Sequence, residues 1–388
     1  MRYRSFKSLF SMALSAALLL GLGCTAFAAE DVSRSVTVSA AGADATATYG
    51  TVSVSISDAL QSNNALEVLS ENGHRAEVTA DSVSAGGEFP TGLSVSSKAN
   101  GSLSRVTAGG VSARGEDSAI ALGVTVFDGG RAEISVGEQG VTAVADDYAI
   151  GLHAGVFGSG TVNAELLGDL AVSGGYQARG TVLVAPPAGS ESVTVNGNLT
   201  ARSNGDAAAA EIDLGESAAG DVMLRVHGDL LSNDVGLLIQ NDSGVPAATV
   251  VVDGTVKGQN TAIVVSDPET VGSLRLVAWK IVRSRSGNVA ETTGGMPAAE
   301  LQKAVNYIVR TSVPEGVKLS AAGISYQEDL GLYTAHEGDE LSFYVEVPKG
   351  VKLEGVYNGE KALEQGSDGG FRLSVPRGGG VELRVVTK

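Results

Sequence analysis

Short apolar segments recur along this chain at an almost constant interval. Within each segment apolar and polar residues alternate, a pattern typical of β-strands that bury one face. In each repeat one apolar residue follows a turn that contains glycine, and this residue anchors the alignment of the repeats. The anchors are Val83, Val111, Val141, Leu170, Leu199, Leu230 and Val256. They are separated by 28, 30, 29, 29, 31 and 26 residues, and so steady a period indicates a repeat architecture.

Each repeat contains three strand-like segments: one that ends before the turn, one that begins at the anchor, and one further along. Three strands in a repeat of constant length predict a coil. Coils stacked about 4.8 Å apart form three parallel sheets around a narrow core. We therefore expect an all-β fold whose main part, residues 34–282, is a right-handed parallel β-helix with three strands and 26–31 residues per coil. A β-sandwich or barrel is the alternative, although those folds show no repeat of constant length.

A short polar residue follows glycine directly before several anchors. Asp169, Asn198 and Asp229 occupy this position in successive repeats, and Thr255 occupies it in the next. We expect tight corners here, because glycine tolerates positive φ and a short Asn or Asp side chain bonds nearby backbone. The aligned side chains predict a ladder of turns along the rod. A row of calcium ligands is the alternative, but Asn198 and Thr255 dilute the charge and the glycine-rich calcium nonapeptide is absent.

Residues 1–28 have the features of a secretory signal peptide. Basic residues precede an apolar run, and Ala26-Phe27-Ala28 fits the small-x-small cleavage rule. The run of about 16 residues is shorter than the roughly 20 needed to span a bilayer, so we expect no stable membrane span after cleavage. A retained anchor is one alternative, and a lipid-modified Cys24 is another, although the residues before it fit a lipoprotein signal poorly. We expect a secreted or extracellular protein, including one associated with the cell surface.

A different pattern follows the repeats. Trp279 lies in the last repeat strand, and we expect it to pack over the open end of the core, because solenoid ends need capping. Residues 283–304 are predicted to be a linker and a short helix that starts at Pro297 and becomes a strand near Tyr307. Residues 305–388 contain several strand-like segments between glycine-rich turns, which predicts a small antiparallel all-β module.

The segment SFYVEVPKGVKLEGVYNGEKALEQGSDGGFRLSVPRGGGVELRVV closely resembles the small all-β modules of secreted and surface proteins from Gram-positive gut bacteria. Such modules often follow Gly- and Val-rich parallel β-helix repeats, as they do here. The resemblance implies an adhesin-like protein. The chain departs from anchored relatives because it ends in VELRVVTK, with no LPxTG-type motif, apolar tail or basic stop. We therefore do not expect covalent attachment to a cell wall.

The net charge and the cysteine content limit which binding partners, disulfides and metal sites we expect. The formal net charge is −17, and removing three basic residues with the signal peptide would leave about −20. A surface with this much negative charge repels phosphate backbones, and nucleic acid is therefore not an expected partner. Cys24 is the only cysteine, so the mature chain is expected to have neither a disulfide framework nor a cysteine-ligated metal.

The sequence contains no HExxH, no GxSxG, no Walker loop and no dinucleotide-binding fingerprint, so we predict no catalytic residue, no metal ligand and no cofactor. Many parallel β-helices are polysaccharide lyases or glycoside hydrolases of the pectin-lyase-like class, and this enzyme function is the alternative. It requires facing carboxylates, or a cluster of Asp ligands for calcium beside a basic residue. The adjacent acids Glu116-Asp117 and Asp146-Asp147 align just before the third strand, so we interpret both pairs as corner residues. The arginines of the coils do not share one column, and His227 lies at a corner.

Phe127 and Phe157 are the candidate binding residues. They are one period apart and each follows the third strand of its repeat, so they should stack on neighbouring coils. Stacked rings stabilise a coil, and they can also offer a platform for a sugar ring. We expect a secreted or surface-associated non-enzymatic protein that acts in adhesion or binds a glycan or a host or cell-surface ligand. The sequence specifies neither the ligand nor the oligomeric state.

Overall fold

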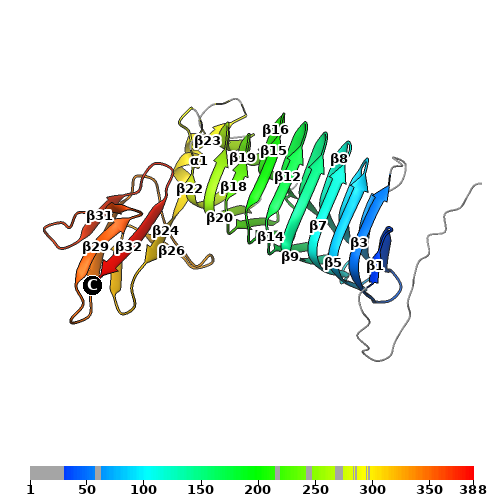
Figure 1. Ribbon diagram of the computed structural model, residues 1–388, viewed down its shortest axis with the longest axis horizontal. Helices are drawn as coiled ribbons and strands as arrows, with labels where there is room; N and C mark the ends of the chain where they lie inside the picture. The colour runs from blue at the N-terminus through cyan, green and yellow to red at the C-terminus, as the bar shows by residue number, and fades with distance from the viewer. Residues whose placement is uncertain are drawn as a thin grey trace, which may run out of the picture.

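The computed structural model describes residues 30–56, 63–214, 219–241, 247–266 and 274–388, except residues 283, 285, 294, 296 and 297. The predicted signal peptide and Cys24 lie outside these residues, as does Pro297. The described chain is a β-solenoid of about eight turns that continues into a smaller β module at its C-terminal end (Figure 1).

The coils have three faces, which we name A, B and C. The strands of faces A and B belong to one sheet, and the strands of face C form a second sheet. Face C contains β2 (Val36–Ala40), β4 (Asn63–Ser70), β6 (Pro90–Ser97), β8 (Ser118–Phe127), β10 (Tyr148–Phe157), β13 (Gln177–Val184), β16 (Asp206–Leu214), β19 (Val235–Asn241), β21 (Thr261–Val265) and β23 (Ala290–Thr292). Six long strands run through face A and then face B: β3 (Ala45–Ile56), β5 (Arg75–Gly87), β7 (Leu103–Gly115), β9 (Arg131–Ala145), β20 (Ala247–Gly258) and β22 (Leu274–Ile281). In the coils between them, face A has β11 (Thr161–Leu166), β14 (Ser190–Val195) and β17 (Asp221–Val226), and face B has β12 (Leu170–Gly174), β15 (Leu199–Ser203) and β18 (Leu230–Ser232). The short β1 (Glu30–Val32) pairs with β3.

Neighbouring coils pair in parallel, with equivalent residues directly opposite each other. The sequence anchors form one continuous column: Val83, Val111, Val141, Leu170, Leu199, Leu230 and Val256. No hairpin interrupts the described coils between residues 75 and 265. The predicted right-handed parallel β-helix with three strands per coil is therefore confirmed.

The core is a narrow column of packed apolar side chains that runs along the rod. Strand residues alternate between inward and outward directions, so each face supplies one set of inward columns. On face C the column Leu66–Leu93–Leu122–Leu152 is fully buried. Burying a Leu or Val side chain stabilises a protein by about 1.5–3 kcal/mol. Because the columns recur in every coil, this stabilisation accumulates along the rod.

The polar corner between faces A and B forms the predicted ladder of turns. The backbone N–H of Asn198 donates to Asp169 Oδ1 at 2.7 Å. The N–H of Asp229 donates to Asn198 Oδ1 at 2.9 Å, and the N–H of Thr255 donates to Asp229 Oδ1 at 2.7 Å. Each short polar side chain therefore satisfies the corner backbone of the next coil, and the interpretation of this row as turns is confirmed.

The reason for glycine at this corner differs from the expected one. Gly168, Gly197 and Gly228 do not have a positive φ, so the explanation from conformational freedom was wrong. A Cβ atom on Gly197 would lie 2.3 Å from Asp169 Oδ1, and one on Gly228 would lie 2.6 Å from Asn198 Oδ1. Glycine is required because the side chain of the preceding coil occupies the space where a Cβ would be.

The C-terminal end of the core is closed by a helix and the strand after it. The helix α1 (Ala299–Ala304) buries Leu301, and β24 (Asn306–Ser312) buries Tyr307. Both residues belong to the same apolar cluster as the core of the coils. Tyr307 pairs with Ala278 of β22 in parallel, so this strand stacks on the last coil.

Trp279 does not cap the core, and that prediction was wrong. Ala278 faces the core, so alternation along β22 turns Trp279 outwards. Trp279 packs instead on an outer cluster formed by Val251, Val277, Ile308 and Leu330. The guanidinium of Arg310 lies 4.2 Å from the centroid of the indole ring, which is a cation–π geometry.

The C-terminal module contains two sheets and a hairpin. Its strands are β25 (Lys318–Ala322), β26 (Ser325–Gln327), β27 (Leu332–Ala335), β28 (Glu340–Glu346), β29 (Leu353–Asn358), β30 (Lys361–Ala362), β31 (Phe371–Ser374) and β32 (Val381–Thr387). The strands β25, β28 and β31 form an antiparallel sheet. In the second sheet, β32 pairs with β29 antiparallel and with β24 parallel. The hairpin β26–β27 pairs with β24, so β24 joins the module to the rod.

Candidate functional site

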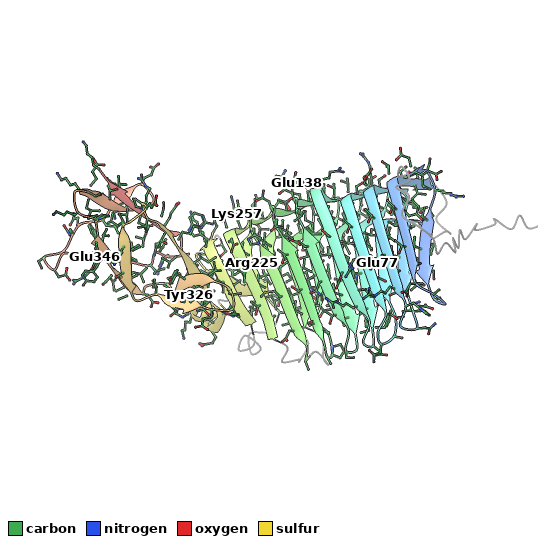
Figure 2. All side chains as sticks on the ribbon, turned by 90° about the horizontal axis from the view of Figure 1, so that it is seen from below. Glu77, Glu138, Arg225, Lys257, Tyr326 and Glu346 are labelled. Atoms are coloured by element: carbon green, nitrogen blue, oxygen red, sulfur yellow. The ribbon has the colours of Figure 1, made fainter. Side chains whose placement is uncertain are left out.

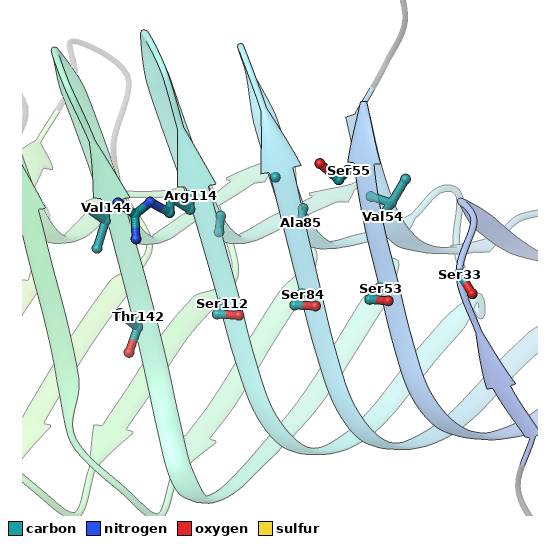
Figure 3. Close-up of a pocket in the computed structure, with 12 residues that line it drawn as sticks. Ser33, Ser53, Val54, Ser55, Ser84, Ala85, Ser112, Arg114, Thr142 and Val144 are labelled. Atoms are coloured by element: carbon teal, nitrogen blue, oxygen red, sulfur yellow. The ribbon is translucent and has the colours of Figure 1, made fainter. Parts of the chain in front are cut away.

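A shallow groove of about 660 Å³ runs along the outer surface of face B. It crosses β3, β5, β7 and β9 and extends to Ser33 after β1. Figure 3 shows Ser53, Ser84, Ser112 and Thr142 as one row across these strands. We name these four residues the hydroxyl row.

The hydroxyl row follows directly from the repeat. Ser84, Ser112 and Thr142 each come immediately after an inward anchor, and Ser53 follows Val52, which pairs with the anchor Val83. All four residues must therefore point outwards. The register places Ser53 opposite Ser84, Ser84 opposite Ser112, and Ser112 opposite Thr142. Hydroxyl groups are therefore repeated along the rod axis about every 4.8 Å. The row ends where Ala171 takes the equivalent position opposite Thr142.

A second row, two residues further along each strand, forms the side of the groove. It contains Ser55, Gly86, Arg114 and Val144. Gly86 leaves a notch: a Cβ there would meet only ordinary contacts, the nearest being Ser55 Oγ at 3.6 Å. Arg114 is exposed and extends toward Val144 (Figure 3).

The charge around the groove favours a neutral ligand. Among the described residues that line the groove, Arg114 is the only charged one. The exposed acids Glu116, Asp117, Asp146 and Asp147 follow at the corner between faces B and C. In that corner the backbone N–H groups of Asp147 and Tyr148 donate to the Asp117 carbonyl at 3.0 and 2.9 Å. The acid pairs thus occupy a corner, and they give the edge of the groove a negative charge that disfavours polyanions.

The two phenylalanines that the sequence singled out lie elsewhere, at the corner between faces C and A. Their ring centroids are 5.5 Å apart and the ring planes differ by 23°, so Phe127 and Phe157 stack on neighbouring coils. Phe157 lies back over its own strand, where a Cβ on Gly155 would be 3.5 Å from its Cε2. The stack therefore has a packing role. Sugar binding at this pair stays a prediction, and the pair is not part of the groove.

A second, smaller groove of about 340 Å³ lies on face A and contains two carboxylates, Glu133 and Glu165. Glu133 is bound by Arg105 Nη2 and Arg131 Nη2, each at 2.6 Å. Glu165 accepts a hydrogen bond from Asn196 Nδ2 at 3.3 Å. Two arginines from different columns thus meet at one acid, a contact that was not predicted from the sequence.

A carboxyl group lies inside the core, and the sequence had not led us to expect it. Glu191 of β14 is 1% exposed and pairs in register with Val162 and Val222, which are both core residues. Neither of its carboxyl oxygens has a hydrogen-bond partner within the described chain. Burial raises the pKa of Glu191 well above its ordinary value. An acid in an inward column that otherwise holds Ala132, Val162, Val222 and Ala248 is the signal that could have identified it from the aligned repeats.

His227 at its corner has an acidic partner. Its Nδ1 lies 2.5 Å from Asp253 Oδ2, and Arg225 Nη2 lies 3.4 Å from the same oxygen. Among the described residues, no serine or threonine hydroxyl is bonded to His227. The arrangement is therefore an ion pair between Arg225 and Asp253 that His227 joins by a hydrogen bond, rather than a nucleophile–base pair.

Comparisons with family models, with curated proteins and with solved structures find no match to this chain. Within the described ranges, no helix has the length and apolar character needed to cross a membrane. Nor do those ranges contain a group of three or more His, Cys, Asp or Glu side chains that could hold a metal ion.

Proposed function

We propose that this protein is a secreted or cell-surface-associated, non-enzymatic rod that binds glycans in an adhesion role. The observation that carries the proposal is the groove on face B, with its row of hydroxyl groups from Ser53 to Thr142. Hydroxyl groups exchange hydrogen bonds with sugar hydroxyls as both donors and acceptors. An extended glycan lying along the rod axis would meet the same polar group in each successive coil.

The ligand we propose is a neutral glycan. The chain has a formal net charge of −17, and exposed acids border the groove, so acidic polysaccharides would be repelled. In a neutral complex Arg114 would act as a hydrogen-bond donor to sugar hydroxyls. Binding should then depend only weakly on salt, because screening acts mainly between charged partners.

A glycoside hydrolase is the second candidate, and one observation favours it: Glu133 and Glu165 line the same groove on face A. Hydrolases of this kind use two carboxyl groups flanking the scissile bond. Here Glu133 is held by Arg105 and Arg131, and Glu165 by Asn196. Both carboxylates already have partners, whereas the described residues that line the groove on face B include no carboxylate. We therefore favour binding over hydrolysis.

The groove can be tested by filling it. Gly86→Phe places a ring in the notch beside Ser55, and the ordinary contacts around its Cβ leave the coil undisturbed. Gly123→Phe is the matched control, because its Cβ on face C would have only Thr91 Cγ2 at 4.0 Å. Retention is measured on immobilised neutral glucan, mannan, galactan and desialylated mucin, with polygalacturonate as the acidic comparison.

We expect the wild type and Gly123→Phe to be retained on at least one neutral glycan and not on polygalacturonate. Gly86→Phe should bind at least about tenfold more weakly, which corresponds to about 1.4 kcal/mol. Equal retention of Gly86→Phe and the wild type would contradict the assignment of the groove. Release of reducing or unsaturated ends that stops in Glu133→Gln or Glu165→Gln would establish the enzyme instead. Detection of the chain in the culture medium or on intact cells tests the proposed location.

A further inference from the structure

The hairpin β26–β27 carries a pair of exposed tyrosines at the junction of the module and the rod, where Figure 2 labels Tyr326. Tyr326 and Tyr333 are directly opposite each other in the antiparallel register. Their ring centroids are 5.0 Å apart with an angle of 47° between the planes. The two residues are 54% and 46% exposed, so much of each ring faces solvent.

The opposite side of this hairpin is fixed to the rod. Leu330 and Leu332 pack on the outer apolar cluster of the last coils, which includes Val251 and Val277. Thr334 is fully buried, and its backbone pairs with Ile308 of β24. Because adjacent strand residues point in opposite directions, the packing of Leu332 and Thr334 forces Tyr333 outwards.

An ion pair fixes the loop of the hairpin as well. Arg275 of β22 binds both carboxyl oxygens of Asp329, with Nη2 at 3.1 Å from Oδ1, and it donates to Gln327 Oε1 at 2.6 Å. A bidentate contact of this kind restricts orientation as well as distance. The two rings are thus held in place on a rigid support, which lowers the entropy lost when a ligand binds them.

The other exposed aromatic pairs differ in this respect. Phe127 and Phe157 stack with nearly parallel planes, and Phe157 covers the space over Gly155. Tyr148 and Tyr176 meet edge to face, with 67° between their planes, beside the acidic corner at Asp147. The tilted pair on the hairpin presents two adjacent ring faces, and Arg275 neutralises its nearby Asp329.

We infer that Tyr326 and Tyr333 form a second glycan-binding site, at which the rings stack on the apolar face of a pyranose and the phenol groups hydrogen-bond to its hydroxyls. Tyrosine suits this role because it combines a large apolar ring with a polar tip. The inference rests on the proposed glycan-binding function, but it concerns a different face of the rod and different residues. A protein partner is the other occupant that such a pair could take, and the experiment separates the two.

The test replaces both rings by Thr, which keeps the β-propensity of the strands. Tyr326→Thr/Tyr333→Thr is compared with Tyr148→Thr/Tyr176→Thr, a matched pair of exposed tyrosines on the coils. Each double variant is made in the full chain, with and without Gly86→Phe, and is assayed on the same neutral glucan, mannan, galactan and desialylated mucin. Circular dichroism and thermal unfolding show whether each variant is folded.

We expect Gly86→Phe to keep residual binding to a neutral glycan, and we expect this binding to fall at least about fivefold when Tyr326 and Tyr333 are replaced. The control pair at Tyr148 and Tyr176 should leave it unchanged. If the hairpin variant binds like its parent while Gly86→Phe weakens the wild type, the second site is refuted and the proposed function stands. If the wild type is retained on none of the glycans, both fall. The alternative outcome is that the hairpin variant loses binding to cells. If protease treatment of the cells then abolishes wild-type binding and glycosidase treatment does not, the partner is a protein and the inference is overturned.

Discussion

The buried acid Glu191 provides a direct test of how the core is built. It occupies an inward position between Val162 and Val222, with no hydrogen-bond partner for either carboxyl oxygen among the described residues. Burial disfavours the charged form, so the pKa of Glu191 in the folded state lies well above its ordinary value. The carboxyl group is therefore protonated in the folded rod at pH values at which it is ionised in the unfolded chain.

The sign of the pH dependence follows from linkage. Between the unfolded pKa of about 4.3 and the raised folded pKa, the folded state binds more protons than the unfolded state. The free energy of unfolding must therefore fall as pH rises through this window, by up to about 1.4 kcal/mol per pH unit for one group. The contribution of Glu191 is fully present below pH about 4.3 and is lost as the pH approaches and passes the raised value.

Two variants separate the effect of titration on stability from the effect of burying a polar group. Glu191→Gln keeps the size and removes the titration, so its free energy of unfolding should lack the downward slope that Glu191 gives the wild type. Glu191→Leu also removes the unsatisfied polar group, whose burial costs about 1–3 kcal/mol. We expect the Leu variant to exceed the wild type by about that amount at pH 7.

The measurement is urea unfolding followed by circular dichroism from pH 4 to pH 8. The difference between the wild type and Glu191→Gln cancels the other titrating groups. Among those groups is His153, whose pKa is lowered by burial against the opposing effect of Glu211. Parallel pH profiles for the wild type and Glu191→Gln would refute the reasoning, because they would show that this carboxyl group does not change its proton affinity on folding.

Two further substitutions test the corner and the junction. Gly197→Ala should destabilise the rod by about 1–3 kcal/mol, because its Cβ would lie 2.3 Å from Asp169 Oδ1, whereas Gly42→Ala, with no atom within 4 Å of its Cβ, should be neutral in the same unfolding assay. Arg275→Met keeps the apolar stem but loses the contacts to Asp329 and Gln327, so the amides of β26 and β27 should exchange hydrogen faster while those of the coils stay unchanged; equal exchange in both would show that the ion pair does not hold the hairpin.

The repeat could be predicted from the sequence because each coil of a solenoid has the same local pattern and pairs in register with the next coil. Spacing and alternation place Val83, Val111 and Val141 in one inward column, and the structure has them there. The residues after these anchors must then point outwards as a row. The hydroxyl row was therefore present in the sequence as the position that follows each anchor, although it was not recognised.

The remaining features depend on contacts that no periodicity describes. The outward direction of Trp279 follows from alternation, but the cluster that covers it comes from Ile308 and Leu330 beyond the repeats. The glycine at the polar corner was identified for the wrong reason, because the space it frees is filled by Asp169 of the preceding coil. The tyrosine pair depends on an ion pair between Arg275 and Asp329, 54 residues apart.

The same geometry explains why the two proposed binding sites are at the surface, one on the N-terminal coils and one at the C-terminal junction. In the middle coils the inward positions are mostly apolar, with Glu191 as an exception. The outer column of face B that holds the hydroxyl row is interrupted by Ala171 after β9. Toward the C-terminal end the outer positions of face A become apolar, and Val251 and Val277 are covered by the hairpin. The module thus seals a surface that the coils alone would expose, and the alternation that buries its leucines presents its tyrosines. Stability and recognition at this junction therefore follow from the two faces of a single hairpin.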